Sequence, residues 1–169
     1  MKYFNTLFVL LILVVLVGAC DKNSVPTNPN YPPNIFATIA GTFGLNYRGL
    51  ASVYTVTSPH NGLQIISTYQ DSSGISHSII FHIYFLDNIE KTGTFKFLMK
   101  PDTATTDYAV GVYQHSEGSV KRLFSSYEGE IYLEKISGTS AKGTFNLFTK
   151  ESESGSSVNI SNGTFNISD

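Results

Sequence analysis

Hydrophobic and polar positions alternate with a period of two along most of the chain from Ile35 to its end. Short runs rich in Ile, Val, Tyr, Phe and Thr are separated by clusters of Gly, Asn, Ser and Asp, and no window of helical length repeats apolar residues every 3.6 positions. Short connectors favour antiparallel neighbours. We therefore predict an all-β domain: a single antiparallel β-sandwich or flattened β-barrel of about ten strands, mostly in meander order.

The strands expected from this pattern are short and closely spaced. Turn formers combined with a glycine predict hairpin turns at residues 59–62, 71–74 and 151–157. The expected strands are 35–47, 51–57, 62–70, 75–86, 93–99, 107–114, 119–127, 129–136, 142–150 and 156–168.

The segment 75–86 (ISHSIIFHIYFL) is the longest strand candidate. Alternation places His77, Phe81 and their neighbours at odd positions on one all-apolar face, which we expect to be core. The even face, which carries His82 and Tyr84, is too apolar for free exposure. This strand is therefore either covered on both sides or lines a cavity with His82 and Tyr84, which we take as candidate ligand-binding residues.

The tripeptide Gly-Thr-Phe occurs four times, starting at Gly41, Gly93, Gly143 and Gly163. We interpret it as a strand entry, where glycine relaxes the backbone and the Phe and the residue two positions later face the same side. The segments between the copies do not align, so recurring strand chemistry is favoured over an ancestral repeat.

The first 20 residues have the pattern of a bacterial lipoprotein signal peptide. Lys2 precedes an unbroken run of 11 apolar residues, and small residues lead to Cys20. The run suits a secretory signal and is well short of the ~20 residues that a membrane-spanning helix needs. We expect cleavage before Cys20 and acylation of its thiol, with several acyl chains such as palmitate holding the protein on the membrane.

Residues 20–34 hold four of the six prolines and almost nothing apolar, which predicts an extended tether. The expected organisation is thus a signal peptide at 1–19, a tether with lipidated Cys20 at 20–34, and one all-β domain at 35–169. This arrangement places the domain in the cell envelope of a Gram-negative bacterium, with the outer membrane, on its periplasmic or surface side, as the expected location.

The charge and cysteine content limit the kinds of partner and the sources of stability that we expect for this protein. Removing residues 1–19 loses only Lys2, which leaves 10 basic against 13 acidic residues and a net charge of −3. The sequence has no basic patch of the kind that binds nucleic acid. Cys20 is the only cysteine, so the exported domain has no disulfide and depends on packing.

The C-terminal half contains residues 129–136 (GEIYLEKI), 141–147 (AKGTFNL) and 158–165 (VNISNGTF). Together with residues 36–41 and 93–95, these segments resemble small lipoproteins of Bacteroidetes-type bacteria that carry an uncharacterised all-β domain. The resemblance implies one final strand with a bulge at Asn162-Gly163, whereas Asn-Gly alone equally suits a two-residue hairpin. The family has no established activity, so the resemblance implies no functional residue.

Candidate chemistry is sparse. His77 and His82 are five positions apart on one strand, so they point to opposite faces and cannot share a metal ion. Glu130 and Glu134 share a strand face but lie roughly 13 Å apart, beyond the spacing of glycosidase carboxylates, and are typical of a solvent face. No catalytic, phosphate-binding or calcium-binding motif occurs. We expect no catalytic residue, metal or cofactor.

Thr103 follows Asp102 and precedes Ala104, a pattern that Bacteroidetes-type cells O-glycosylate, and it is a candidate glycosylation site. The sequence thus favours a membrane-anchored, non-catalytic binding or envelope accessory module for an unknown small molecule, glycan or protein. One alternative is a calycin-like carrier of a small apolar ligand. Another is an inhibitor or immunity-type lipoprotein that caps a protein partner through a strand edge or the 100–107 loop.

Overall fold

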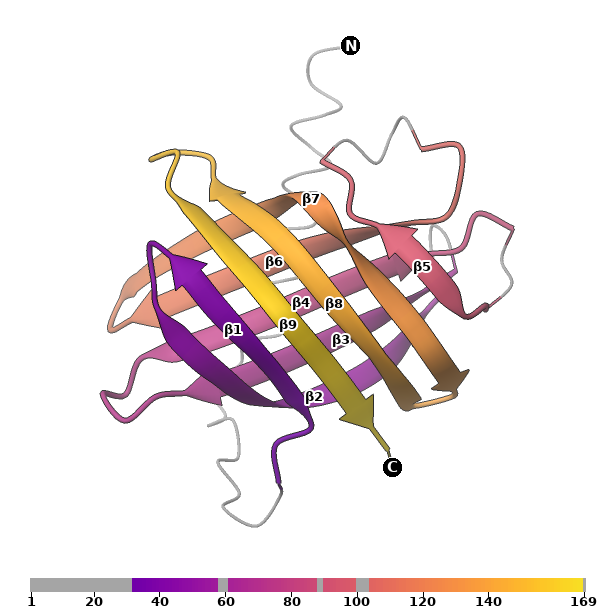
Figure 1. Ribbon diagram of the computed structural model, residues 1–169, viewed down its shortest axis with the longest axis horizontal. Helices are drawn as coiled ribbons and strands as arrows, with labels where there is room; N and C mark the ends of the chain where they lie inside the picture. The colour runs from indigo at the N-terminus through magenta and orange to yellow at the C-terminus, as the bar shows by residue number, and fades with distance from the viewer. Residues whose placement is uncertain (1–31, 58–60, 88–89, 100–103, 169) are drawn as a thin grey trace. The chain divides into compact units, whose positions relative to one another are not determined.

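The computed structural model describes residues 32–57, 61–87, 90–99 and 104–168, which form one compact unit built from nine strands (Figure 1). Alternating burial along the strands reproduces the alternation in the sequence. None of the described residues forms a helix long and apolar enough to span a membrane. The strands are β1 (Ile35–Gly41), β2 (Leu45–Val56), β3 (Gly62–Gln70), β4 (Ser76–Tyr84), β5 (Gly93–Lys96), β6 (Tyr108–Glu117), β7 (Val120–Ser137), β8 (Ser140–Glu151) and β9 (Ser157–Ile167).

Eight of the strands close into an antiparallel barrel. Their order around the wall is β7-β6-β4-β3-β2-β1-β9-β8, and β8 pairs back with β7 to complete the circle. The ninth strand, β5, pairs with the second half of β7. The all-β antiparallel prediction is therefore confirmed, and of the two architectures left open by the sequence the structure has the barrel.

Two strand predictions were wrong in their boundaries. The expected strand 35–47 is two strands, because Gly41 takes a φ of 105° and the chain turns before β2. The expected strands 119–127 and 129–136 are one strand, β7, whose register with β8 shifts between Ser126 and Glu128 and whose Gly129 has a φ of 119°. A bulge thus bends β7 without ending it, and turn-like residues there do not mark a turn.

Asn162 has a φ of 52°, and the registers of β9 with both neighbouring strands shift at this point. The Asn162-Gly163 pair is consequently a bulge inside one continuous strand and not a hairpin turn. A Cβ on Gly163 would lie 2.5 Å from the Phe145 ring, which explains the glycine. The strand-entry interpretation of Gly-Thr-Phe holds for Gly93, which begins β5. It is wrong for the other three copies, because Gly41 ends β1 and Gly143 and Gly163 lie inside β8 and β9.

The barrel interior is a continuous apolar core. The odd residues of β4, from His77 to Ile83, and Phe85 directly after the strand are all buried, which confirms the predicted core face except at its first residue, Ile75, which is half-buried. Aromatic rings fill the middle, where Phe81 lies 4.7 Å from Phe145 and 5.6 Å from Phe97 between ring centroids. Eight-stranded barrels are either filled by side chains or hold one small ligand, and the interior of this barrel is filled by side chains.

Candidate functional site

His82 and Tyr84 lie on the outer surface of the barrel. The Gln64 side-chain amide on β3 donates a hydrogen bond to His82 Nε2 at 2.8 Å. The rings of His82 and Tyr84 stack with their centroids 6.1 Å apart. These two candidate residues therefore share a face, as predicted, but they point away from the interior.

Tyr108 extends this pair into a row. It lies opposite Tyr84 in the register of β4 with β6, and the two rings stack at 4.8 Å between centroids. Tyr108 is only 7% exposed, and burial, with a smaller contribution from Tyr84, raises its pKa to about 12. Burial also lowers the pKa of His82. At neutral pH the row of His82, Tyr84 and Tyr108 is therefore an uncharged aromatic surface with polar tips.

A hollow of about 350 Å³ begins where this row ends. Its walls are residues 91–96, Leu98 and residues 106–108, so Tyr108 belongs both to the row and to the hollow. Its lining includes apolar Leu98 and the polar residues Thr92, Thr94 and Thr106, and Phe95 beneath them is a core residue that is only 3% exposed. Ligand sites combine these features: concave apolar surface with a few convergent polar groups.

The charges at the hollow are largely paired. Lys91 Nζ lies 2.6 Å from Asp107 Oδ2 and 2.8 Å from Asp87 Oδ2, and the Asp107 hydrogen bond is the main reason that the pKa of Lys91 is raised. Asp107 also accepts a hydrogen bond from the Leu86 backbone N–H at 2.8 Å. These contacts hold the segment before β6 against the end of β4.

The hollow lies at a seam in the barrel wall. The first half of β7 pairs with β6 up to the Val112–Ser125 pair, and its second half pairs with β5 instead. Beyond that pair, β5 and the start of β6 are joined by a parallel bridge between Phe97 and Ala109 and by the hydrogen bond from Leu98 N to Ala109 O at 2.9 Å. Residues on both sides of this junction, 91–96 and 106–108, line the hollow.

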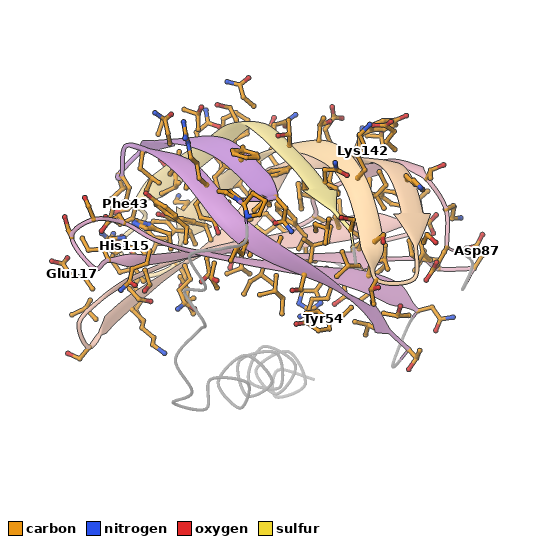
Figure 2. The ribbon with its side chains drawn as sticks, turned by 90° about the horizontal axis from the view of Figure 1, so that it is seen from below. Phe43, Tyr54, Asp87, His115, Glu117 and Lys142 are labelled. Carbon is orange, nitrogen blue, oxygen red and sulfur yellow. The ribbon has the colours of Figure 1, made fainter. Side chains whose placement is uncertain are left out.

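A second group of polar side chains is buried at the opposite end of the barrel, where Figure 2 labels Phe43 and His115. His77 and His115 face each other across β4 and β6, with ring centroids 5.2 Å apart. His77 Nδ1 hydrogen-bonds Tyr113 Oη at 2.8 Å, and Phe43 stacks on His115 at 4.0 Å.

The outer nitrogens of this pair are poorly satisfied. His77 Nε2 lies 3.5 Å from Asp71 Oδ2, and neither it nor His115 Nδ1 has a hydrogen-bond partner within the described part of the chain. Burial lowers the pKa of both histidines. No cluster of three or more possible ligand residues is placed to hold a metal ion in the ranges that the structure describes. This pair therefore forms a buried neutral group that packs under Phe43.

The remaining sequence candidates are dispersed. Glu130 and Glu134 are exposed on the outer face of β7, and Glu134 pairs with Lys142 at 2.8 Å, which confirms that this is a solvent face. Cys20, Thr103 and most of the tether lie outside the described residues. Of the 100–107 loop, the described part supplies Thr106 and Asp107 to the hollow.

Sequence reasoning missed Tyr108 and the seam. Tyr108 is 24 positions after Tyr84, and only the β4–β6 register brings the two together.

Neither a protein-family model, nor a curated protein, nor a solved structure matches the chain.

Proposed function

We propose that the protein is a lipid-anchored, non-catalytic binding module of the bacterial cell envelope, which holds its partner at the seam between β5 and β6. The observation that supports this proposal is that Tyr108, which stacks on Tyr84 of the aromatic row, lines the hollow together with Thr106 and Asp107 from the described part of the 100–107 loop. The anchor at Cys20 and the outer-membrane location are part of the same proposal and rest on the signal-peptide pattern.

A binding role suits this surface better than catalysis. Lys91 Nζ lies 2.6 Å from Asp107 Oδ2, so these two charged groups of the hollow neutralise each other and neither is a free acid or base. A carrier with an apolar ligand inside the barrel is less well supported. Its ligand would compete for space with Phe81, Phe97 and Phe145, whose rings are in contact.

Site-directed photo-crosslinking in the native envelope tests the proposal. A photoreactive residue is placed at Thr106 in the hollow or, as a matched control, at Thr144, which is equally a surface threonine but lies on β8. We expect a discrete adduct from Thr106 and none from Thr144, and Tyr84→Ala should reduce the Thr106 adduct.

Absence of an adduct at Thr106, or equal adducts at both positions, would contradict a site at the seam. The non-catalytic part is tested separately with the purified chain. Turnover of a glycan or ester substrate that Glu130→Gln abolishes would contradict it.

A further inference from the structure

We propose that the Phe43 side chain is an acid-released plug: it seals the buried histidine pair at the end of the barrel opposite the hollow, and it leaves this position when His115 takes up a proton. This device goes beyond the proposed function, because it lies away from the seam and does not depend on what binds there. Local opening of this kind needs a movable side chain and a group whose charge decides whether that side chain stays in place.

The plug rests on rings that belong to distant strands of the wall. Phe43 lies in the turn between β1 and β2, and β3 and β4 separate β2 from β6 in the sheet order. Its ring nevertheless stacks on His115 of β6 at 4.0 Å between centroids, with an interplanar angle of 15°. It also meets the Phe124 ring of β7 edge-on at 5.7 Å and lies 6.0 Å from the Tyr113 ring. Phe43 therefore reaches across the end of the barrel, beside His115 (Figure 2).

The chain around Phe43 allows the side chain to move without disturbing the sheet. Thr42 fixes the turn to β9, because its N–H and its hydroxyl both donate to Ser157 O, at 3.1 Å and 3.0 Å. The residue after Phe43 is Gly44, and a Cβ placed there would have no atom within 4 Å. A glycine in open space lets the backbone rotate with little steric cost. Phe43 can thus swing outward while Thr42 keeps the turn attached to the barrel.

His115, directly beneath the plug, has no strong acceptor for a proton that it takes up. It is only 6% exposed, and its Nδ1 has no hydrogen-bond partner in the described part of the chain. Its Nε2 lies 4.0 Å from Oε2 of Glu117, a largely exposed side chain. Both ring nitrogens carry a proton in the charged form. A buried imidazolium with neither N–H satisfied is unfavourable, so protonation favours a movement that admits water to the ring.

A cation–π contact with Phe43 does not compensate for this burial. The Arg122 guanidinium already lies 5.4 Å from the centroid of the Phe43 ring. Glu151 holds it there by accepting two hydrogen bonds, at 3.0 Å and 2.7 Å. A second cation on the same ring is repelled by the first. A charged His115 is therefore better accommodated when Phe43 moves away and water reaches the imidazolium.

The charged and titratable groups that face the histidine pair come from five parts of the fold. They are Tyr69 of β3, Asp71 of the β3–β4 turn, Tyr113 and Glu117 of β6, Arg122 of β7 and, through Arg122, Glu151 of β8. Burial is the main reason that the pKa of His115 is lowered, and the neighbouring His77 and Arg122 lower it further, whereas Glu117 and Asp71 act in the opposite direction. The surroundings of the closed plug thus oppose a charge on His115.

His77 is better prepared for a proton than His115. Its Nε2 lies 3.5 Å from Asp71 Oδ2, and its Nδ1 is hydrogen-bonded to Tyr113 Oη at 2.8 Å. A charged His77 consequently has a carboxylate inside the fold that attracts it. Because the two imidazole rings are 5.2 Å apart, a charge on His77 makes a charge on His115 still less favourable while the plug is closed. The proton on His115 is therefore the one that displaces Phe43.

The composition of this end of the barrel favours a responsive element over plain packing. The rest of the interior is filled almost entirely by apolar side chains. Two buried histidines, each with one nitrogen that lacks a partner among the described residues, reduce stability compared with apolar side chains of similar size. Here they lie under a side chain that a neighbouring glycine leaves free to move.

The chain contains no tryptophan, so Phe43→Trp provides a single fluorescent reporter at the plug. The mature chain with Cys20→Ser and Phe43→Trp is titrated from about pH 7.5 to about pH 4.5, and quenching by acrylamide is measured together with far-UV circular dichroism. We expect the quenching constant to rise about threefold in one transition below about pH 6.5, while the circular dichroism stays unchanged. The matched control reporter is Phe36→Trp, because Phe36 is already exposed on the outer face of β1 and its quenching should not change with pH.

Histidine variants in the Phe43→Trp background identify the trigger. His115→Gln removes the titratable group and should abolish the transition. His82→Gln is the matched control at a histidine on the outer surface, and it should leave the transition unchanged. A second measurement keeps the size of the native ring, with 4-fluorophenylalanine at position 43 of the mature chain. Its fluorine resonance should move toward that of the free amino acid with the same midpoint.

Quenching and fluorine signals that stay constant while the His115 ring titrates in proton NMR spectra would overturn the proposal, as would a transition that survives His115→Gln. A transition that coincides with loss of the circular dichroism signal would also overturn it, because the barrel then unfolds as a whole. The crosslinking at Thr106 does not depend on the plug, so failure of this device leaves the proposed function standing.

Discussion

Truncation of Phe81 to alanine tests the packing of the barrel at its most constrained point. Phe81 is fully buried at the centre of β4, opposite Gly111 on β6 and Ile65 on β3. Its ring contacts the rings of Phe97 and Phe145. Buried Phe→Ala changes cost ~3–5 kcal/mol, and each aromatic pair adds ~0.5–1.5 kcal/mol beyond burial. We expect a loss of about 4–5 kcal/mol in the free energy of unfolding.

Urea denaturation of the mature chain with Cys20→Ser measures this loss. With a slope of about 2 kcal/mol per molar urea, the midpoint should fall by about 2 M. The matched control is Phe36→Ala, because Phe36 is 42% exposed on the outer face of β1 and its truncation should cost under about 1 kcal/mol. If Phe81→Ala does not fold, Phe81→Leu gives a smaller loss of the same origin. Equal losses at Phe81 and Phe36 would refute the assignment of the inner and outer faces.

Two further predictions concern pH and the anchor. Burial lowers the pKa of His77, His82 and His115 in the folded chain. Because the unfolded chain therefore binds protons more tightly than the folded chain does, the free energy of unfolding should be greatest above about pH 6.5 and should decrease as the pH falls below that value. Urea midpoints between pH 7.5 and pH 5 measure this loss, and a His77→Gln/His115→Gln variant whose midpoint falls as steeply as that of the wild type would contradict the assignment. Cys20→Ser should prevent incorporation of a fatty-acid analogue and leave the signal peptide uncleaved, and label retained by this variant would exclude Cys20 as the acylated residue.

Local pattern was sufficient to predict what each strand does by itself. The period of two in β4 placed Phe81 in the core and His82 and Tyr84 together on the opposite face, because side chains alternate across a strand whatever its neighbours are. It did not predict that this opposite face is the outer surface of the barrel and not the wall of a cavity. The turn at Asp71 was equally local, since its carboxylate accepts hydrogen bonds from the N–H groups of Ser73 and Ile75.

Closure of the barrel and assembly of the site were not local. Closure depends on β7, which is long enough to pair with β8 along its length and with β6 and β5 in turn on its other side. A bulge near Tyr127 permits the change of partner, and in the sequence it resembles a break between two strands. The Tyr84–Tyr108 stack could not be predicted from the sequence either, because it depends on the register of β4 with β6.

At two places in the barrel a strand extends beyond the end of its neighbour, and its backbone groups find different partners at each. At the first, β2 continues beyond the start of β1, and the side-chain amide of Asn34 completes the ladder: it donates to Ala51 O at 3.0 Å and accepts from Ala51 N at 2.7 Å. A single side chain thus imitates the missing strand.

At the second place, β5 extends the wall along β7, and its outer edge is joined to β6 by the bridge between Phe97 and Ala109 and by the hydrogen bond from Leu98 N to Ala109 O at 2.9 Å. Where the pairing of β6 with β7 ends, the Ser126 hydroxyl accepts a hydrogen bond from the Gly111 N–H at 2.9 Å. Exposed backbone groups need water or a partner, and a closed barrel has few of them to offer. The same fold thus completes one edge with a side chain and joins the other to the start of β6 through the backbone, and the hollow where we propose that the partner binds lies beside this junction.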